Sequence, residues 1–140
     1  MKLQLVTLSG IIIDENIYEV IIPTSSGEIA VFPGHEPLVT LAVGGALLVR
    51  KHKGDSNSQM ELFAINGGVV EVEPERVRIL VDEADSSEDI IESEVEKALE
   101  LARKQKQEAK SQVELSKAQE MIDRHATRLK VAGLRRRHKN

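Results

Sequence analysis

The hydrophobic period of the chain changes at Ser86, and this change constrains the fold more than any other feature. Before Ser86 the apolar residues form short, often β-branched runs that turn residues separate from one another. Many short strands with frequent turns are typical of a sandwich or barrel rather than of a parallel sheet with crossover helices. The pattern predicts an all-β sandwich or flattened barrel of about eight to ten short strands over residues 1–85.

Turn residues predict where these strands end. We expect Pro23 to end a strand over residues 17–22, and we expect a turn at Gly44-Gly45. Asn66-Gly67 is a strong hairpin-turn dipeptide and is expected to join two separate strands. Residues 50–58 are polar and lie between two strand patterns, which predicts the loop of a hairpin.

Residues 86–140 have the period of two helices, and the simplest packing is an antiparallel helical hairpin with a basic end. Ser86 is followed by acidic residues, so it is a candidate N-cap. Residues 104–110 are polar all round and predict the end of the first helix, and Gly133 is expected to end the second. The apolar stripe of the first helix consists of Ile91, Val95, Ala98, Leu99 and Ala102, and that of the second of Leu115, Ala118, Ile122, His125, Leu129 and Ala132.

Both stripes are narrow and rich in alanine. Each buried CH₂ group contributes only ~0.8 kcal/mol, so small side chains stabilise a helix contact weakly. We therefore expect weak docking of the helix pair and an ability to rearrange.

Charge is distributed unevenly along the chain. Residues 1–111 contain 11 Lys and Arg against 20 Asp and Glu, a net charge of -9, whereas residues 112–140 contain 8 against 3, a net charge of +5. An acidic body with a basic end suggests an interaction tail. Nucleic acid is one conceivable partner, although the chain has few aromatic side chains on which bases could stack.

No constellation of residues predicts catalysis or metal binding. The four histidines, His35, His52, His125 and His138, are scattered, there is no cysteine, and no glycine loop precedes a helix. His35 and Glu36 are adjacent, so regular structure would not aim both at one substrate. We expect no enzyme activity, no metal and no cofactor. We also expect no secretory signal and no membrane insertion, because no apolar run approaches the ~20 residues of a span.

Two segments carry a resemblance to a known family. Residues 27–40 read GEIAVFPGHEPLVT and residues 66–72 read NGGVVEV. The first segment is similar to the signature of the epsilon subunit of F-type ATP synthases, and the second is similar to a later strand of that family. The rest of the chain fits the family in order and length, and the family's flattened β-sandwich agrees with the predicted strands.

The resemblance implies a non-catalytic rotor subunit in the central stalk. Such a subunit binds the gamma subunit and the c ring and couples proton flow to ATP synthesis. It would lie peripherally on the cytoplasmic side of a bacterial cell membrane or on the stromal side of a plastid thylakoid. The family positions at the foot of the stalk, where the β domain contacts the c ring and the gamma subunit, match Glu28 and His35.

The C-terminal helices of the family can contact the alpha and beta subunits of the catalytic head and block ATP hydrolysis. The matching candidates here are Arg124, Arg128, Arg135, Arg136 and Arg137. Some members also bind ATP through two arginines four residues apart, which match Arg124 and Arg128. Residues 90–95 depart from the other half of that motif, since they lack arginine and carry acids that would repel a triphosphate.

A second function remains open from the residues alone. The chain could be a free-standing adaptor whose basic helical end binds nucleic acid. Recovery of gamma, alpha and beta subunits from membranes would favour the rotor function, and recovery of nucleic acid without them would favour the adaptor.

Overall fold

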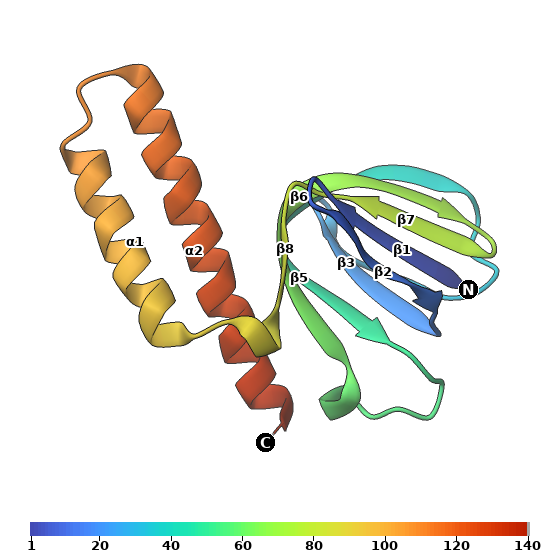
Figure 1. The fold of residues 1–140 in the computed structure, drawn as a ribbon. Coiled ribbons are helices and arrows are strands. Elements are labelled where there is room, and N and C mark those ends of the chain that lie inside the picture. Colours follow the sequence, from blue (N-terminus) through green and yellow to red (C-terminus); the bar gives the residue numbers. More distant parts are fainter. Residues whose placement is uncertain (140) are drawn as a thin grey trace.

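The computed structural model describes the backbone of residues 1–139 and the side chains of residues 1–138; Asn140, the last residue of the predicted helical region, lies outside the described residues. A β domain of eight strands is followed by two helices (Figure 1), as the sequence predicted. The strands are β1 (Lys2–Thr7), β2 (Gly10–Asn16), β3 (Glu19–Thr24), β4 (Gly27–Val31), β5 (Leu38–Arg50), β6 (Glu61–Glu73), β7 (Arg76–Leu80) and β8 (Ala84–Ser86). The helices are the 3₁₀ turns η1 (Asn57–Gln59) and η2 (Ser87–Asp89) and the α-helices α1 (Glu92–Gln107) and α2 (Gln112–Lys139).

The strands form one hydrogen-bonded sheet that folds over into two layers. Its order is β2-β1-β7-β6-β5-β3-β4, and β8 also pairs with β6. The long strands β5 and β6 run through both layers (Figure 1). The first layer contains β2, β1, β7, the end of β6 and the start of β5, and the second contains β4, β3, β8 and the remaining halves of β5 and β6.

The predicted turns at Gly44-Gly45 and Asn66-Gly67 are wrong. Both pairs lie inside the continuous strands β5 and β6, where Gly44 is the partner of Asn66. Gly67 has a φ of 107° and marks the bend at which the hairpin passes from one layer to the other. Residues that permit a tight turn also permit a sharp bend within a strand, which is why the sequence did not separate the two.

Pro23 also does not end its strand. It lies within β3 and is the partner of Glu28 in β4. On the β5 side the register shifts between Ile21 and Thr24, so the hydrogen bond that proline cannot donate falls at an irregularity. A Cβ on Gly45 would come within 3.1 Å of the Pro23 side chain, and the glycine therefore makes room for the ring.

The main core lies between the two layers and is almost entirely aliphatic. Leu3, Leu5, Val20, Ile22, Leu47, Ile65, Val77 and Ile79 are among its fully buried members. A second, smaller cluster lies on the outer face of the second layer. It consists of Ala46, Leu48, Met60, Leu62, Ala64 and Val131.

The second cluster is where the helix pair meets the β domain. Val131 belongs to α2 and is fully buried against β5 and β6. Figure 1 shows α2 next to the sheet and α1 on its far side. The four residues 46–49 are all buried because both faces of β5 are covered there.

Two helix boundaries differ from the prediction. Ser86 caps η2 by accepting a hydrogen bond from the Glu88 N–H, and α1 begins only at Glu92. Gly133 does not end α2, which continues to Lys139. Leu134 packs against the second cluster, and this tertiary contact outweighs the low helix propensity of glycine. The predicted end of the first helix is confirmed, since α1 stops at Gln107.

Candidate functional site

The loop between β4 and β5 is fixed to the turn between β6 and β7. Gly34, with a φ of 86°, donates its N–H to the carbonyl of Pro74 at 2.7 Å. His35 donates its own N–H to the Phe32 carbonyl at 3.2 Å, and its ring Nδ1 donates to the Glu36 carbonyl at 2.7 Å. These bonds hold the His35 ring in one orientation and leave its Nε2 available to a partner.

Glu28 lies apart from that loop. It is exposed near the start of β4, whereas His35 follows the end of the same strand. Extended chain rises ~3.3 Å per residue, so residues 28 and 32 already lie roughly 13 Å apart, and His35 follows three residues later. The structure therefore presents the two predicted contact residues as separate points on the surface.

The outer face of the first layer carries a row of five apolar side chains that the sequence analysis did not identify; four are exposed and Val6 is half-buried. The register places Leu41 beside Val69, Val69 beside Leu80, Leu80 beside Val6, and Val6 beside Ile11. We call these five residues the apolar row. Leu41 is 64% exposed and Ile11 63% exposed. The row runs across five strands, so only the strand register, which the sequence does not give, brings it together.

A polar row lies next to the apolar row on the same face. Here Arg78 contacts Glu71 at 3.8 Å and donates from Nε to the Gln4 side-chain oxygen at 3.3 Å. Lys2 pairs with Asp14 at 3.2 Å. An apolar centre with a polar edge is the usual anatomy of a protein–protein interface.

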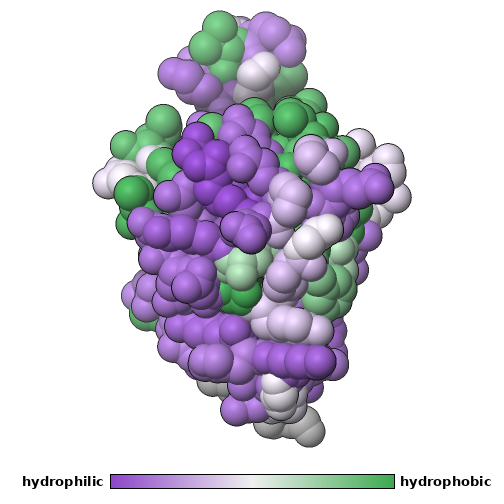
Figure 2. All heavy atoms as spheres, turned by 90° about the vertical axis from the view of Figure 1, so that its right-hand side faces the viewer, coloured by the Kyte–Doolittle hydropathy of each residue, from purple (hydrophilic) through white to green (hydrophobic). Residues whose placement is uncertain are grey.

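Hydrophilic side chains dominate the end of the β domain that lies farthest from the helices. Figure 2 shows this end, with hydrophobic groups gathered mainly toward its upper edge. The N-terminus and the turn between β6 and β7 lie at this end, where Lys2 donates its N–H to the Glu75 carbonyl at 2.8 Å. A polar end and an apolar outer face give the β domain two chemically different surfaces.

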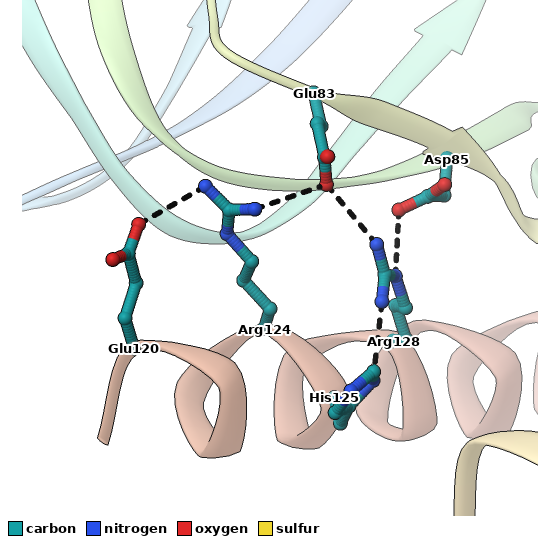
Figure 3. A network of polar contacts seen from close by, with 6 residues as sticks. All are labelled: Glu83, Asp85, Glu120, Arg124, His125 and Arg128. Atoms are coloured by element: carbon teal, nitrogen blue, oxygen red, sulfur yellow. Dashed lines mark hydrogen bonds and ion pairs between the residues drawn. The ribbon is translucent and has the colours of Figure 1, made fainter. Parts of the chain in front are cut away.

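Arg124 and Arg128 are brought together on α2, facing the strand that leads to the helices (Figure 3). Arg128 binds Asp85 at 2.7 Å through Nε and Glu83 at 3.1 Å through Nη2. Arg124 contacts Glu83 at 3.4 Å and Glu120 at 3.1 Å. Only 18% and 19% of the Arg128 and Arg124 side chains are exposed, so the β domain and α2 are joined by partly buried, charge-assisted bonds.

His125 is the buried member of this network. Its Nδ1 lies 3.1 Å from Arg128 Nη1. Burial lowers the pKa of His125, the positive charges of Arg128 and Arg124 lower the pKa further, and Asp85 and Glu83 act in the opposite direction.

The predicted basic tail is part of α2, and two of its arginines contact residues 87–92, the segment that leads into α1. Arg135 donates to the Ser87 carbonyl at 3.3 Å and lies 3.7 Å from Glu88. Arg136 pairs with Glu92 at 3.1 Å. Arg137 is exposed near the end of the helix.

A cavity of about 490 Å³ adjoins Arg124, and the charged residues of its lining are mainly acidic. Its charged members are Asp82, Glu83, Glu120, Asp123 and Arg124. This excess of carboxylates would repel a triphosphate, which adds to the argument from residues 90–95 against a nucleotide site. Within residues 1–139 we find no cluster of three side chains suited to a metal ion. None of the helices in this part of the chain has the length and apolar character that crossing a membrane requires.

Comparisons with known proteins identify the family of the β domain and of the whole chain. Residues 1–87 match the family model described as the ATP synthase Delta/Epsilon chain, beta-sandwich domain. The ATP synthase epsilon chain of Herpetosiphon aurantiacus is 34% identical, over 97% of this chain and 96% of that protein. The chloroplastic ATP synthase epsilon chain of Oltmannsiellopsis viridis is 32% identical, over 95% of this chain and 99% of that protein.

Solved structures give the same result. A chain in the Euglena gracilis mitochondrial ATP synthase structure, which contains OSCP, F1 and the c ring, superposes with a TM-score of 0.74 at 27% identity, covering 89% of this chain and 76% of that one. A chain from the central stalk and c ring of the Tetrahymena thermophila mitochondrial ATP synthase shares the fold, with a TM-score of 0.57 at 15% identity and coverage of 94% and 96%. The resemblance inferred from residues 27–40 and 66–72 is confirmed, and the chain belongs to the ATP synthase epsilon chain family.

Proposed function

We propose that this chain is a non-catalytic central-stalk subunit of a proton-translocating ATP synthase. It binds the gamma subunit and the c ring, so that proton flow through the ring is coupled to ATP synthesis in the alpha and beta subunits. Residues 1–85 form the rotor-binding domain and residues 86–140 the regulatory helical part. The observation that carries the proposal is the apolar row, an uncovered binding face on a stiff β-sandwich of this family.

The apolar row is the face that binds gamma. The outer face of the second layer is covered by Val131 and its helix, whereas Leu41, Val69 and Leu80 remain exposed on the outer face of the first layer. Burial of exposed apolar area contributes roughly 25 cal/mol per Å². The ion pairs of the polar row border this apolar centre on one side and orient the partner.

Glu28 and His35 are the contacts with the c ring. Glu28 supplies an exposed carboxylate, and His35 supplies a ring held by its bond to the Glu36 carbonyl. The Gly34–Pro74 hydrogen bond stiffens the loop. A stiff contact suits a subunit that turns with the ring, because a flexible loop would absorb the displacement.

Inhibition of ATP hydrolysis uses the arginines of α2. In the docked arrangement Arg124, Arg128, Arg135 and Arg136 are engaged with carboxylates of the same chain. Release of the helix pair exchanges these partners for acidic segments of the catalytic head, toward which opposite charge steers the helix. Arg137 extends the same positive surface.

The chain is placed on the membrane through its partners. It lies on the side that carries the catalytic head, the cytoplasmic side in a bacterium or the stromal side of a thylakoid. The internal pairing of the α2 arginines leaves less free positive charge for nucleic acid than the sequence suggested, and this disfavours the adaptor function.

Association with purified gamma tests the apolar row. Leu41→Asp places a charge at its edge and is expected to weaken association at least about tenfold, equivalent to ~1.4 kcal/mol. Leu101→Asp is the matched control, because Leu101 is an exposed leucine on α1, 57% exposed against 64% for Leu41. Equal affinity of wild type and Leu41→Asp would remove the apolar row from the gamma contact.

The c-ring contacts and the inhibitory contacts need separate measurements. Glu28→Ala and His35→Ala should lower coupled ATP synthesis by the assembled complex without changing gamma affinity. A truncated chain of residues 1–85 should leave the head with faster ATP hydrolysis than the full chain does. Unchanged hydrolysis would exclude inhibition while leaving the coupling function intact.

A further inference from the structure

The contact between His125 and Arg128 fixes the protonation state of the imidazole. A guanidinium group has only donors, so in a hydrogen bond of 3.1 Å to Arg128 Nη1 the His125 Nδ1 must be the acceptor. An Nδ1 that accepts carries no proton. The docked arrangement therefore contains a neutral His125 whose only ring proton is on Nε2.

The surroundings of His125 make a second proton unfavourable. The residue is 8% exposed. The charged groups that act on it are Arg124 and Arg128 from its own helix, and Glu83 and Asp85 from the chain that leads into and forms β8. From α1, the partner helix, the buried residues are the uncharged Leu99 and Ala102. A protonated ring would place a third cation among two arginines and would lose its bond to Arg128.

Arg128 is the residue through which that proton would act. The same guanidinium binds Asp85 and Glu83, the carboxylates on the β-domain side of the contact (Figure 3). A cation at His125 repels Arg128 at hydrogen-bonding distance. Both residues lie on α2, so the repulsion is relieved by movement of the Arg128 side chain, and this movement weakens its bonds to Asp85 and Glu83 across the contact.

We propose that His125 is a proton-sensitive element of the contact between α2 and β8: the neutral ring holds the helix pair docked, and protonation releases it. The biological meaning of this device, regulation of the inhibitory helices, rests on the proposed function. The device itself is a property of the isolated chain and is tested without any partner.

The sign of the pH dependence follows from the direction of the pKa shift. The pKa of His125 is lowered in the docked state, mainly by burial, and returns toward its ordinary value of ~6.5 when the helices leave. The docked state is fully favoured above that ordinary value. It loses population as pH falls below ~6.5, by up to tenfold per pH unit, until the docked ring also titrates. Carboxylates titrate near pH 4, below this window.

A distance measurement on the full chain tests the proposal. The sequence contains no cysteine, so Ser26→Cys on the turn between β3 and β4 and Lys104→Cys on α1 give two unique labelling positions, both exposed. Electron-spin distance distributions at pH 7.5 are expected to show one distance, that of the docked state. At pH 5.5 a second, broader population of distances should appear, and the ratio of docked to released molecules should fall at least about threefold.

Variants at two positions separate His125 from the other histidines. His125→Asn keeps an acceptor in place of Nδ1 but has no titration in this range, so its distance should be the same at both pH values. His52→Asn is the matched control, because His52 is exposed in the loop after β5, and it should open as the wild type does. His125→Gln carries the same expectation as His125→Asn and replaces it should circular dichroism show that the Asn variant is unfolded.

Either of two results would overturn the proposal: a wild-type distance that is unchanged at pH 5.5, or an Asn or Gln variant that opens as much as the wild type. Neither result bears on gamma association, which is measured at pH 7.5 with the helices docked. Conversely, failure to bind gamma would leave the pH response of the distance unaffected.

Discussion

Arg128 carries most of the polar contact between the helix pair and the β domain. Its bond to Asp85 is the shortest ion pair in the network, at 2.7 Å, and both partners are partly protected from water. A double-mutant cycle with Arg128→Gln and Asp85→Asn should give a coupling energy of about 1 kcal/mol, above that of a typical exposed pair. Chemical denaturation of the four proteins measures it.

The chain offers a matched pair for comparison. Arg103 and Glu100 lie 3.8 Å apart on α1, with 57% and 80% of their side chains exposed. The same cycle at these positions should give a coupling near zero, because solvent screens exposed charges. Similar coupling energies for the two pairs would show that the Arg128 contact does not hold the helices.

At the scale of the single element, β6 depends on Gly68. A Cβ at this position would come within 2.3 Å of the Leu80 carbonyl oxygen and 2.7 Å of the Val81 side chain, and neither can move without disturbing β7. Gly68→Ala should therefore destabilise the chain by about 1–3 kcal/mol, the usual cost of overpacking. Gly44→Ala is the control, since its Cβ would meet nothing closer than 3.5 Å.

Urea denaturation distinguishes these two variants by their midpoints at constant slope. A Gly44→Ala midpoint close to the wild type, together with a lowered Gly68→Ala midpoint, is expected. Equal midpoints for wild type and Gly68→Ala would mean that the β6–β7 contact can relax to admit a methyl group.

The sequence pattern predicted turns inside β5 and β6, where the structure has continuous strands. The pattern did predict the apolar segments of both strands and a loop between them near residues 50–58, because these features depend on neighbouring residues only. Asn66-Gly67 was predicted to be a turn, but whether such a pair forms a turn or a bend within a strand depends on the partner strand. Gly133 was misjudged for a similar reason: Leu134 gains its contacts from residues far away in the chain.

The whole molecule has two regions of unequal packing. The main core joins all the strands from β1 to β7, whereas the helix pair is attached through a small cluster and a set of ion pairs. Amide hydrogen exchange should therefore be faster in α1 and α2 than in β1, β6 and β7. Added salt should accelerate exchange in the helices and leave the strands nearly unchanged, because screening weakens ion pairs and not apolar packing.

Uniform protection across both regions, or equal acceleration by salt, would contradict this division. The sequence anticipated weak docking from the alanine-rich stripes, and this experiment tests that expectation. It could not anticipate the partners of Arg128, because Asp85 and Glu83 lie 43 and 45 residues away. The apolar row could not be predicted for the same reason, because its members come from five strands and are brought together only by the strand register.

The hairpin of β5 and β6 reaches from one end of the β domain to the other without interruption. It starts beside the loop that carries His35 and finishes beneath Val131. A load applied at the loop is therefore carried toward α2 by continuous strands, and it crosses the bend at Gly67 on the way. Under the proposed function, displacement of the loop by the c ring would move β5 and β6, and with them the second cluster against which α2 packs.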